Sequence, residues 1–102
     1  MEPDCSTLRA CLREGRVRPA PNIHSKRAHF IDASIVAQVF VGCFRVVRDA
    51  RTDTSGRPRH PDGWIMWGRR LDRRTFRVDF NLVHTESGEF IEIVTVIEVG
   101  DR

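Results

Sequence analysis

The stretch "TFRVDFNLVH", residues 75 to 84, decides the fold that we expect for this chain. Apolar and polar side chains alternate along it, and this period of two is typical of a β-strand with one buried and one polar face. The apolar positions are Phe76, Val78, Phe80 and Leu82, and the polar positions between them are Arg77, Asp79 and Asn81. We therefore expect helices to cover the apolar face, and solvent or a ligand to contact the polar face.

Further strands are expected on both sides of this one. Residues 64 to 71, "WIMWGRRL", precede it, and residues 89 to 99, "EFIEIVTVIEV", follow it. The connections "DRR" and "TESG" are short enough for hairpins, which favours an antiparallel meander. Residues 44 to 51, "FRVVRDAR", predict a fourth strand. The Ser, Gly, Pro and Asp residues of the segment 52 to 63 predict a long exposed loop after it.

Helices are expected ahead of the strands. Residues 5 to 16, "CSTLRACLREGR", have apolar residues at helical spacing, with Ser6 or Thr7 as the N-cap and Gly15 as the stop. The two prolines of "VRPAPN", residues 17 to 22, predict an extended strap. A short helix is expected at about residues 23 to 30.

The clearest helical pattern is "DASIVAQVFVG", residues 32 to 42. Its apolar stripe consists of Ile35, Val36, Val39 and Phe40. Asp32 or Ser34 can cap the N-terminus, and Gly42 can end the helix.

This order of elements predicts an α+β domain, with two or three N-terminal helices packed on one face of a four-stranded antiparallel sheet. We expect a single domain over residues 1 to 102, since the chain falls within the usual size of one domain. Residues 1 to 22 would form the first helix and the proline-containing strap. Residues 23 to 99 would form a core in the order α-α-β-β-β-β.

Composition excludes several classes of protein. No run approaches the roughly 18 apolar residues of a membrane helix, and the N-terminus lacks the apolar centre of a signal peptide, so we expect an intracellular protein without a membrane partner. The three cysteines, Cys5, Cys11 and Cys43, show no Cys-x-x-Cys spacing. We therefore expect buried or incidental thiols rather than a disulfide framework or a zinc site, and neither a metal nor a cofactor.

The positive charge comes almost entirely from arginine. The net charge is +3 with a pI near 9.2, and Lys26 is the lone lysine. A GC-rich genome would explain frequent arginine codons, but five arginines gather between residues 69 and 77, namely Arg69, Arg70, Arg73, Arg74 and Arg77. Arginine pairs with phosphate through two parallel hydrogen bonds and stacks on bases, so this cluster indicates an RNA-binding surface.

An aromatic ring is expected beside that basic face. Trp64 and Trp67 fall on opposite faces of their strand. One tryptophan belongs to the core, and we assign Trp67 to the polar face. Bases of single-stranded RNA stack on such rings while arginines hold the phosphates. The alternative for the polar face is an ordinary solvated surface with arginine–aspartate pairs.

The order of elements and several short motifs resemble the small ribonuclease-toxin superfamily that includes RelE, ParE and BrnT, and especially a family of uncharacterised domains grouped with them. The matching pieces are "IHSKRAHFIDASIVAQVF", "FRVVRD", "WIMWGRRL", "FRVDFNLVH" and "FIEIVTVIEV", within residues 15 to 99. The chain departs from the family where a "KHA" motif reads "KRA" and where a final "TVY" reads "TVI". Either His24 or His29 would then take the place of the family's histidine.

The resemblance implies metal-independent endoribonuclease activity, in which the 2′-hydroxyl attacks the adjacent phosphodiester. It assigns His24 as the acid/base group, with Lys26, Arg27 and His29 near the RNA. Since cations beside His24 disfavour its charged form, His24 would act as the base, and the acid would be His29 or His84. Arg69 and Arg77 would hold the phosphate, with Arg70 and Trp67 contacting the RNA.

Thr95 matches a threonine of the family's last strand, where it would hydrogen-bond the scissile phosphate. Simple alternation, however, puts Thr95 on the same face as Ile91 and Ile93, so we expect a core position unless a bulge changes the register.

The resemblance further implies a bacterial toxin, neutralised by a cognate antitoxin or immunity protein. The toxin would act in the cytoplasm or be delivered into a target cell as part of an effector. Two alternatives stay open. One is a non-catalytic RNA- or protein-binding module of the same fold, and the other is an interaction protein whose arginines reflect codon usage alone.

Overall fold

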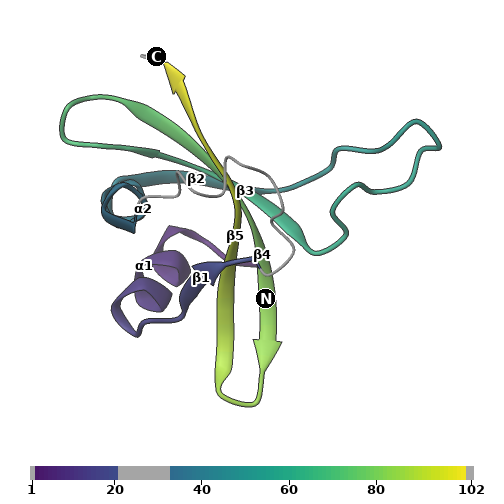
Figure 1. Cartoon of the computed structure of the whole chain (residues 1–102), viewed down its shortest axis with the longest axis horizontal. Coiled ribbons are helices and arrows are strands. Elements are labelled where there is room, and N and C mark those ends of the chain that lie inside the picture. The colour runs from purple at the N-terminus through teal and green to yellow at the C-terminus, as the bar shows by residue number, and fades with distance from the viewer. Residues whose placement is uncertain (1, 21–32, 101–102) are drawn as a thin grey trace.

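The structure is a computed structural model that describes residues 2–20 and 33–100. Within them the elements follow the order α1 (Cys5–Arg13), β1 (Val17–Pro19), α2 (Ala33–Val41), β2 (Cys43–Arg48), β3 (Gly63–Arg69), β4 (Thr75–Thr85) and β5 (Gly88–Gly100). The strands form one sheet in the order β1-β5-β4-β3-β2, and both helices lie on the same side of it (Figure 1). The chain is thus α+β, as its sequence predicts.

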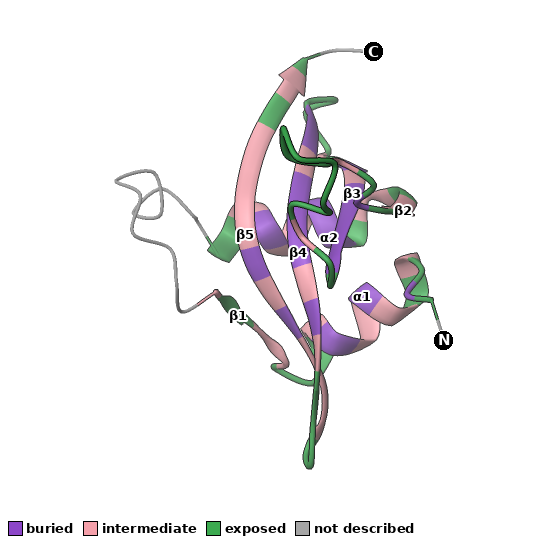
Figure 2. Ribbon diagram, turned by 90° about the vertical axis from the view of Figure 1, so that its right-hand side faces the viewer, coloured by how far each residue is buried: buried purple, intermediate pink, exposed green. Residues whose placement is uncertain are grey.

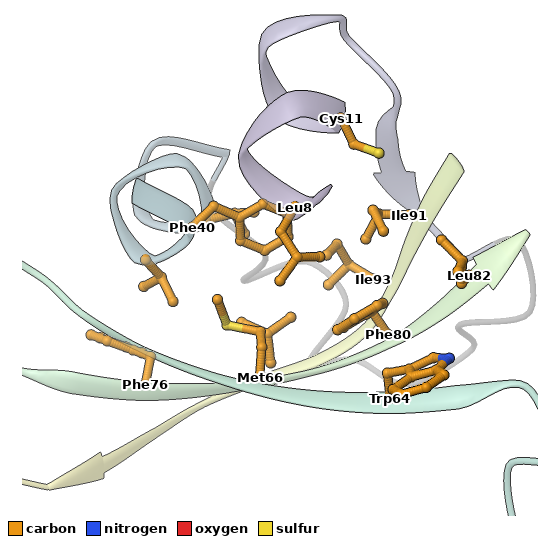
Figure 3. Close-up of a cluster of buried hydrophobic side chains, with 13 residues drawn as sticks. Leu8, Cys11, Phe40, Trp64, Met66, Phe76, Phe80, Leu82, Ile91 and Ile93 are labelled. Carbon is orange, nitrogen blue, oxygen red and sulfur yellow. The ribbon is translucent and has the colours of Figure 1, made fainter. Parts of the chain in front are cut away.

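The core lies between the two helices and the apolar face of the sheet (Figure 3). Phe76, Val78, Phe80 and Leu82 are all buried in it, so the alternation along β4 predicted the correct face. Leu8 of α1 and Phe40 of α2 are completely enclosed and meet these strand residues from the helical layer. Burial of these side chains removes apolar surface from water and is the main force that holds the layers together.

Close contact between α2 and the sheet depends on a glycine in β3. A Cβ at Gly68 would lie 2.0 Å from the backbone oxygen of Val39, which no side chain can tolerate. Gly68 therefore lets the backbone of α2 approach the strand, and Val39 and Phe40 become fully buried. The apolar stripe predicted for this helix is confirmed.

The sheet differs from the expectation by one strand. The strap at Val17–Pro19 pairs in parallel with β5, with Val17 opposite Ile91 and Pro19 opposite Ile93. The sheet is therefore five-stranded and mixed, whereas the expected sheet was four-stranded and antiparallel. Two prolines favoured an irregular strap, but proline is tolerated in a strand at the edge of a sheet, where its missing N–H costs no ladder bond.

One predicted helix start needs correction, one is tested only in part, and one predicted helix cannot be compared. The N-cap of α1 is Asp4, whose carboxylate accepts from the backbone N–H of Thr7 at 2.9 Å in a capping box, rather than Ser6 or Thr7. Ser34 is inside α2 and does not cap it. Asp32 and the short helix expected at residues 23 to 30 lie outside the described residues.

A disulfide joins Cys5 to Cys43, which corrects the expectation of unpaired thiols for these two residues. It ties the first residue of α1 to the first residue of β2, across 38 residues of sequence. Spacing along the chain gave no sign of this pair, because only the packing of α1 beside β2 brings the two residues together. A covalent link across a loop of this size contributes about 4 kcal/mol in the chain-entropy account. Cys11 is a buried free thiol, as expected.

Buried and exposed residues are distributed unevenly over the elements. Figure 2 shows buried positions along β3, β4 and the sheet-facing sides of the helices, and exposed positions at the turn between β4 and β5. No helix among the described residues is long and apolar enough to cross a membrane. The face of the sheet opposite the helices carries the polar side chains of β4.

Substitution of Phe80 by alanine tests the arrangement of layers. Phe80 is 1% exposed, so Phe80→Ala should lower the free energy of unfolding by about 3 to 5 kcal/mol through lost transfer energy and the cavity left behind. Phe44→Ala is the matched control, because its ring is 56% exposed and its loss should cost about 0.5 kcal/mol or less. Urea unfolding of both variants measures the difference. Equal costs at the two positions would contradict the assigned faces.

Candidate nucleic-acid interface

The open face of the sheet, meaning the face opposite the helices, is organised in rows that cross the strands. Residues directly opposite each other on neighbouring strands project on the same side. One row runs Arg45, Trp67, Arg77 and Ile97 across β2, β3, β4 and β5. The next row runs Val47, Ile65, Asp79 and Thr95. The pairing thus brings together polar and aromatic residues from four strands.

Two aromatic rings on this face are each stacked with an arginine. The guanidinium carbon of Arg45 lies 5.2 Å from the centre of the Trp67 ring, within the range of a cation–π contact. The guanidinium of Arg69, two residues after Trp67, lies 5.8 Å from the ring of Phe44. Phe44 and Arg45 are both exposed. Arg69 is exposed as well and Trp67 is half-buried, so both arginine–aromatic pairs can be reached from solvent near the β2 edge of the open face.

A β-bulge at the start of β2 puts the neighbouring residues Phe44 and Arg45 on the same face. The register between β2 and β3 shifts between Cys43 and Arg45, which leaves Phe44 as the extra residue. Without the shift, strict alternation would send Phe44 and Arg45 to opposite faces. Neither residue was identified from the sequence, and their signal, an aromatic beside an arginine at the start of a strand, is too common to single out.

A second bulge decides the position of Thr95. Asp79 pairs with Thr95 but Phe80 pairs with Ile93, so Val94 is the extra residue in β5. Ile91 and Ile93 consequently face the core, while Thr95 shares the open face with Asp79. The core position expected from alternation is wrong, and the bulge alternative is correct.

Next to the stacked pairs lies a compact cluster of two aspartates and two arginines. Arg77 Nε donates to Asp79 Oδ1 at 3.1 Å, and Arg51 Nη2 donates to Asp79 Oδ2 at 3.0 Å. Arg51 also donates two hydrogen bonds to Asp49, from Nε to Oδ1 at 2.9 Å and from Nη2 to Oδ2 at 2.7 Å. Since the side chains of Asp49 and Asp79 are 1% and 10% exposed, each carboxylate depends on these arginines for compensation.

The cluster anchors the long loop between β2 and β3. Asp49 and Arg51 belong to that loop, whereas Asp79 and Arg77 belong to β4. Hydrogen bonds from Arg51 lower the pKa of Asp49 from the ordinary 3.8 to about 2. The bond from the Arg51 side chain has the largest effect, and the bond from its backbone N–H adds to it. His60, from the same loop, adds a smaller lowering effect through its charge. The loop thereby adds Arg51 to the open face and brings His60 near the cluster.

The positions predicted from the sequence divide into three groups. Trp67, Arg69, Arg77 and Thr95 come together on the open face, although Arg77 is engaged by Asp79 there. Arg70 does not join them. Its Nε donates to Gln38 of α2 at 3.0 Å and its guanidinium lies 5.8 Å from the Phe76 ring, so it faces the helical side. His24, Lys26, Arg27 and His29 lie outside the described residues.

His84 lies away from the open face. It alternates with Leu82 along β4 and so projects toward the helical side, beyond the core, where its Nδ1 is 3.6 Å from Glu89. Together with Arg59, His60 and Asp62, it lines a shallow hollow of about 500 Å³ at that end of the sheet. In the part of the chain that the structure describes, no three His, Cys, Asp or Glu side chains gather so as to hold a metal ion.

No known protein-family model, curated protein or solved structure matches the chain. The four arginines of the open face, Arg45, Arg51, Arg69 and Arg77, outnumber the two aspartates of the cluster. The surface suits a ligand that is both anionic and aromatic.

The Asp49 carboxylate should make stability depend on pH in acid. Because its pKa is lower in the folded state, its contribution is present above about pH 4 and is lost as the pH falls toward 2. Asp49→Asn should therefore lower the free energy of unfolding at pH 7 by about 2 kcal/mol, and this difference should close by pH 2. Chemical unfolding at a series of pH values measures it.

Asp62→Asn is the control, because it removes the same charge from an exposed position of the same loop. Unfolding free energies of the Asp49→Asn variant that run parallel to those of the unmodified chain from pH 7 to pH 2 would contradict the assigned role of Arg51.

Proposed function

We propose that the open face of the sheet binds single-stranded RNA. The observation that carries the proposal is the pair of arginine–aromatic stacks, Arg45 with Trp67 and Arg69 with Phe44, in which Phe44 and both arginines are exposed and Trp67 is half-buried. Bases stack on rings and on guanidinium planes regardless of sequence, and arginine binds phosphate through parallel hydrogen bonds. Two neighbouring rings offer places for two successive bases of an unpaired strand.

The arginines of the open face differ in how freely they can bind a phosphate. Arg45 and Arg69 are exposed, so they can meet a phosphate at little cost in desolvation. Arg77 is 27% exposed and already bonded to Asp79. A phosphate at Arg77 would therefore use the donors that Asp79 leaves available. Double-stranded RNA fits this face less well, because its stacked bases cannot reach the rings.

Binding of a fluorescent single-stranded RNA oligonucleotide tests this function. Trp67→Ala should weaken binding by about tenfold through loss of a stacking surface. Arg45→Ala should reduce the slope of log affinity against log salt by about one. Arg74→Ala is the matched arginine control, because Arg74 lies in the β3–β4 turn and pairs with Asp72 and Glu98. RNA binding that is absent, or equally weakened by all three changes, would rule out the open face.

A second function, metal-independent endoribonuclease activity, is supported by the position of Thr95. The bulge in β5 gives Thr95 a place on the same face as Arg77, with Asp79 directly beside it. A threonine hydroxyl and an arginine on neighbouring strands can both donate to one phosphate. In this proposal the RNA bound at the stacks presents its phosphodiester to these two residues.

The proposed reaction is an intramolecular transesterification. The 2′-oxygen bonds to phosphorus while its proton passes to His24, and the bond from phosphorus to the 5′-oxygen breaks as that oxygen gains a proton from an acid. His84 projects from β4 toward the helical side, which makes it a weaker candidate for the acid, and His29 remains a candidate.

Product analysis distinguishes this reaction from other kinds of cleavage. The expected products carry 2′,3′-cyclic phosphate ends and form equally well in EDTA. His24→Ala should abolish cleavage, and His84→Ala, a matched exposed histidine, should leave it intact. Ends with 5′-phosphate, or activity that survives His24→Ala, would exclude the mechanism. RNA binding without cleavage would leave the non-catalytic binding module as the function.

The partner and compartment follow from the same proposal. A small acidic antitoxin or immunity protein would neutralise a basic toxin through charge complementarity. Disulfides form and persist in oxidising compartments, so the Cys5–Cys43 bond favours a chain that is exported and delivered into a target-cell cytoplasm over one that stays in the cytoplasm of its own cell.

A further inference from the structure

The end of α2 lies near the turn that joins β3 to β4 (Figure 1). An apolar hollow of about 290 Å³ lies between them. It is lined by Ala37, Gln38, Val41, Gly42, Arg69 and Leu71. Val41 is 65% exposed and Leu71 is 100% exposed. The described part of the chain has just one other large exposed apolar residue, Phe44, whose ring is stacked under Arg69.

Leu71 is unusual for its position. It stands at the tip of a tight turn, which is closed by the bonds from Arg70 N to Arg74 O and from Arg73 N to Arg70 O. Turn tips normally carry polar residues or glycine. A fully exposed leucine next to an apolar hollow leaves apolar area that a bound partner can cover, and such patches mark protein-binding sites when polar residues surround them.

The residues around the hollow are mainly arginines. Arg9 reaches it from α1, where its Nη1 donates to the backbone oxygen of Val41 at 3.2 Å. Arg70 is held beside it by its bond to Gln38, and Arg69 lines it directly. The acidic residue of this turn, Asp72, is paired with Arg70 at 3.7 Å and with Arg74 at 3.9 Å. The rim is therefore positive.

The charge and shape of the hollow favour one of three possible ligands, namely a second copy of the chain, RNA or a segment of another protein. A second copy of the chain, docked symmetrically, would bring two positive rims face to face, which like-charge repulsion disfavours. RNA lacks a surface to stack on here, because the walls are aliphatic rather than aromatic. A protein segment with an apolar anchor and flanking carboxylates matches both the hollow and its rim.

We propose that this hollow docks an acidic protein segment, whose leucine- or phenylalanine-like anchor lies between Val41 and Leu71 and whose carboxylates pair with Arg9 and Arg70. Arg69 borders both this site and the Phe44 ring of the open face, whereas Val41, Leu71, Arg9 and Arg70 belong to the hollow and its rim alone. Substitutions at Val41 and Leu71 therefore test the proposal separately from RNA binding.

Selection from a display library of short random peptides, against the whole disulfide-bonded chain, tests it. The enriched peptides should share an apolar anchor between Asp or Glu residues, and their binding should weaken as salt rises. Leu71→Ser and Val41→Ser should each weaken a selected peptide by about tenfold or more, because each removes apolar area that the anchor would cover. Both residues are exposed, so both variants should fold normally.

Phe44→Ser is the matched control, since it removes the remaining exposed apolar side chain from outside the hollow. Peptide binding should survive it, and Leu71→Ser should leave RNA binding unchanged. Enrichment of basic or uncharged peptides, or binding that survives both substitutions in the hollow, would overturn the proposal. A concentration-dependent dimer that Leu71→Ser dissolves, measured by sedimentation, would also overturn it in favour of a second copy.

Discussion

Burial of one face of β4 under the two helices is the interaction on which the rest of the molecule depends. Phe80 and Val78 are almost completely enclosed, and the helices reach them because Gly68 offers no side chain in the way of α2. Most of the apolar area of a chain of this size is committed to this one core. With both helices on one side, the opposite face of the sheet is left for polar side chains and a loop.

The open face contains a buried charge that needs compensation. Asp79 lies in the middle of the sheet and is largely shielded from water, so its charge needs partners. Arg77 supplies one from the same strand, and Arg51 supplies the other from the β2–β3 loop while also neutralising Asp49. The net positive charge of the face comes from Arg45 and Arg69, because the two aspartates balance Arg51 and Arg77.

The surface divides into two regions of different chemistry that meet at Arg69. On the open face, arginines lie over the rings of Phe44 and Trp67, which suits flat aromatic ligands. At the end of α2, arginines surround the aliphatic Val41 and Leu71, which suits the irregular side chains of a protein. The disulfide lies at the start of β2, next to Phe44 and Arg45, so it fixes the edge of the sheet that carries one of the two regions.

The sequence by itself determined the α+β class, the four antiparallel strands, the main helix and the buried face of β4. These features rest on local periodicity, which burial of one face imposes on each element separately. The same periodicity correctly separated Trp64, which is in the core, from Trp67, which is on the open face.

Only the tertiary structure decided the features that depend on contacts between distant segments. The fifth strand forms because Val17–Pro19 pairs with β5, and the disulfide forms because α1 packs beside β2. The carboxylate–arginine cluster forms because the β2–β3 loop returns to β4. Thr95 and Phe44 depend on bulges, where one extra residue reverses the alternation that a sequence pattern assumes. Arg70, adjacent to Arg69 in sequence, falls on the helical side by strand alternation alone, and the tertiary structure adds its bond to Gln38 of α2. Composition and spacing can assign residues to a face within one strand, but the partners across the sheet determine which residues finally share a site.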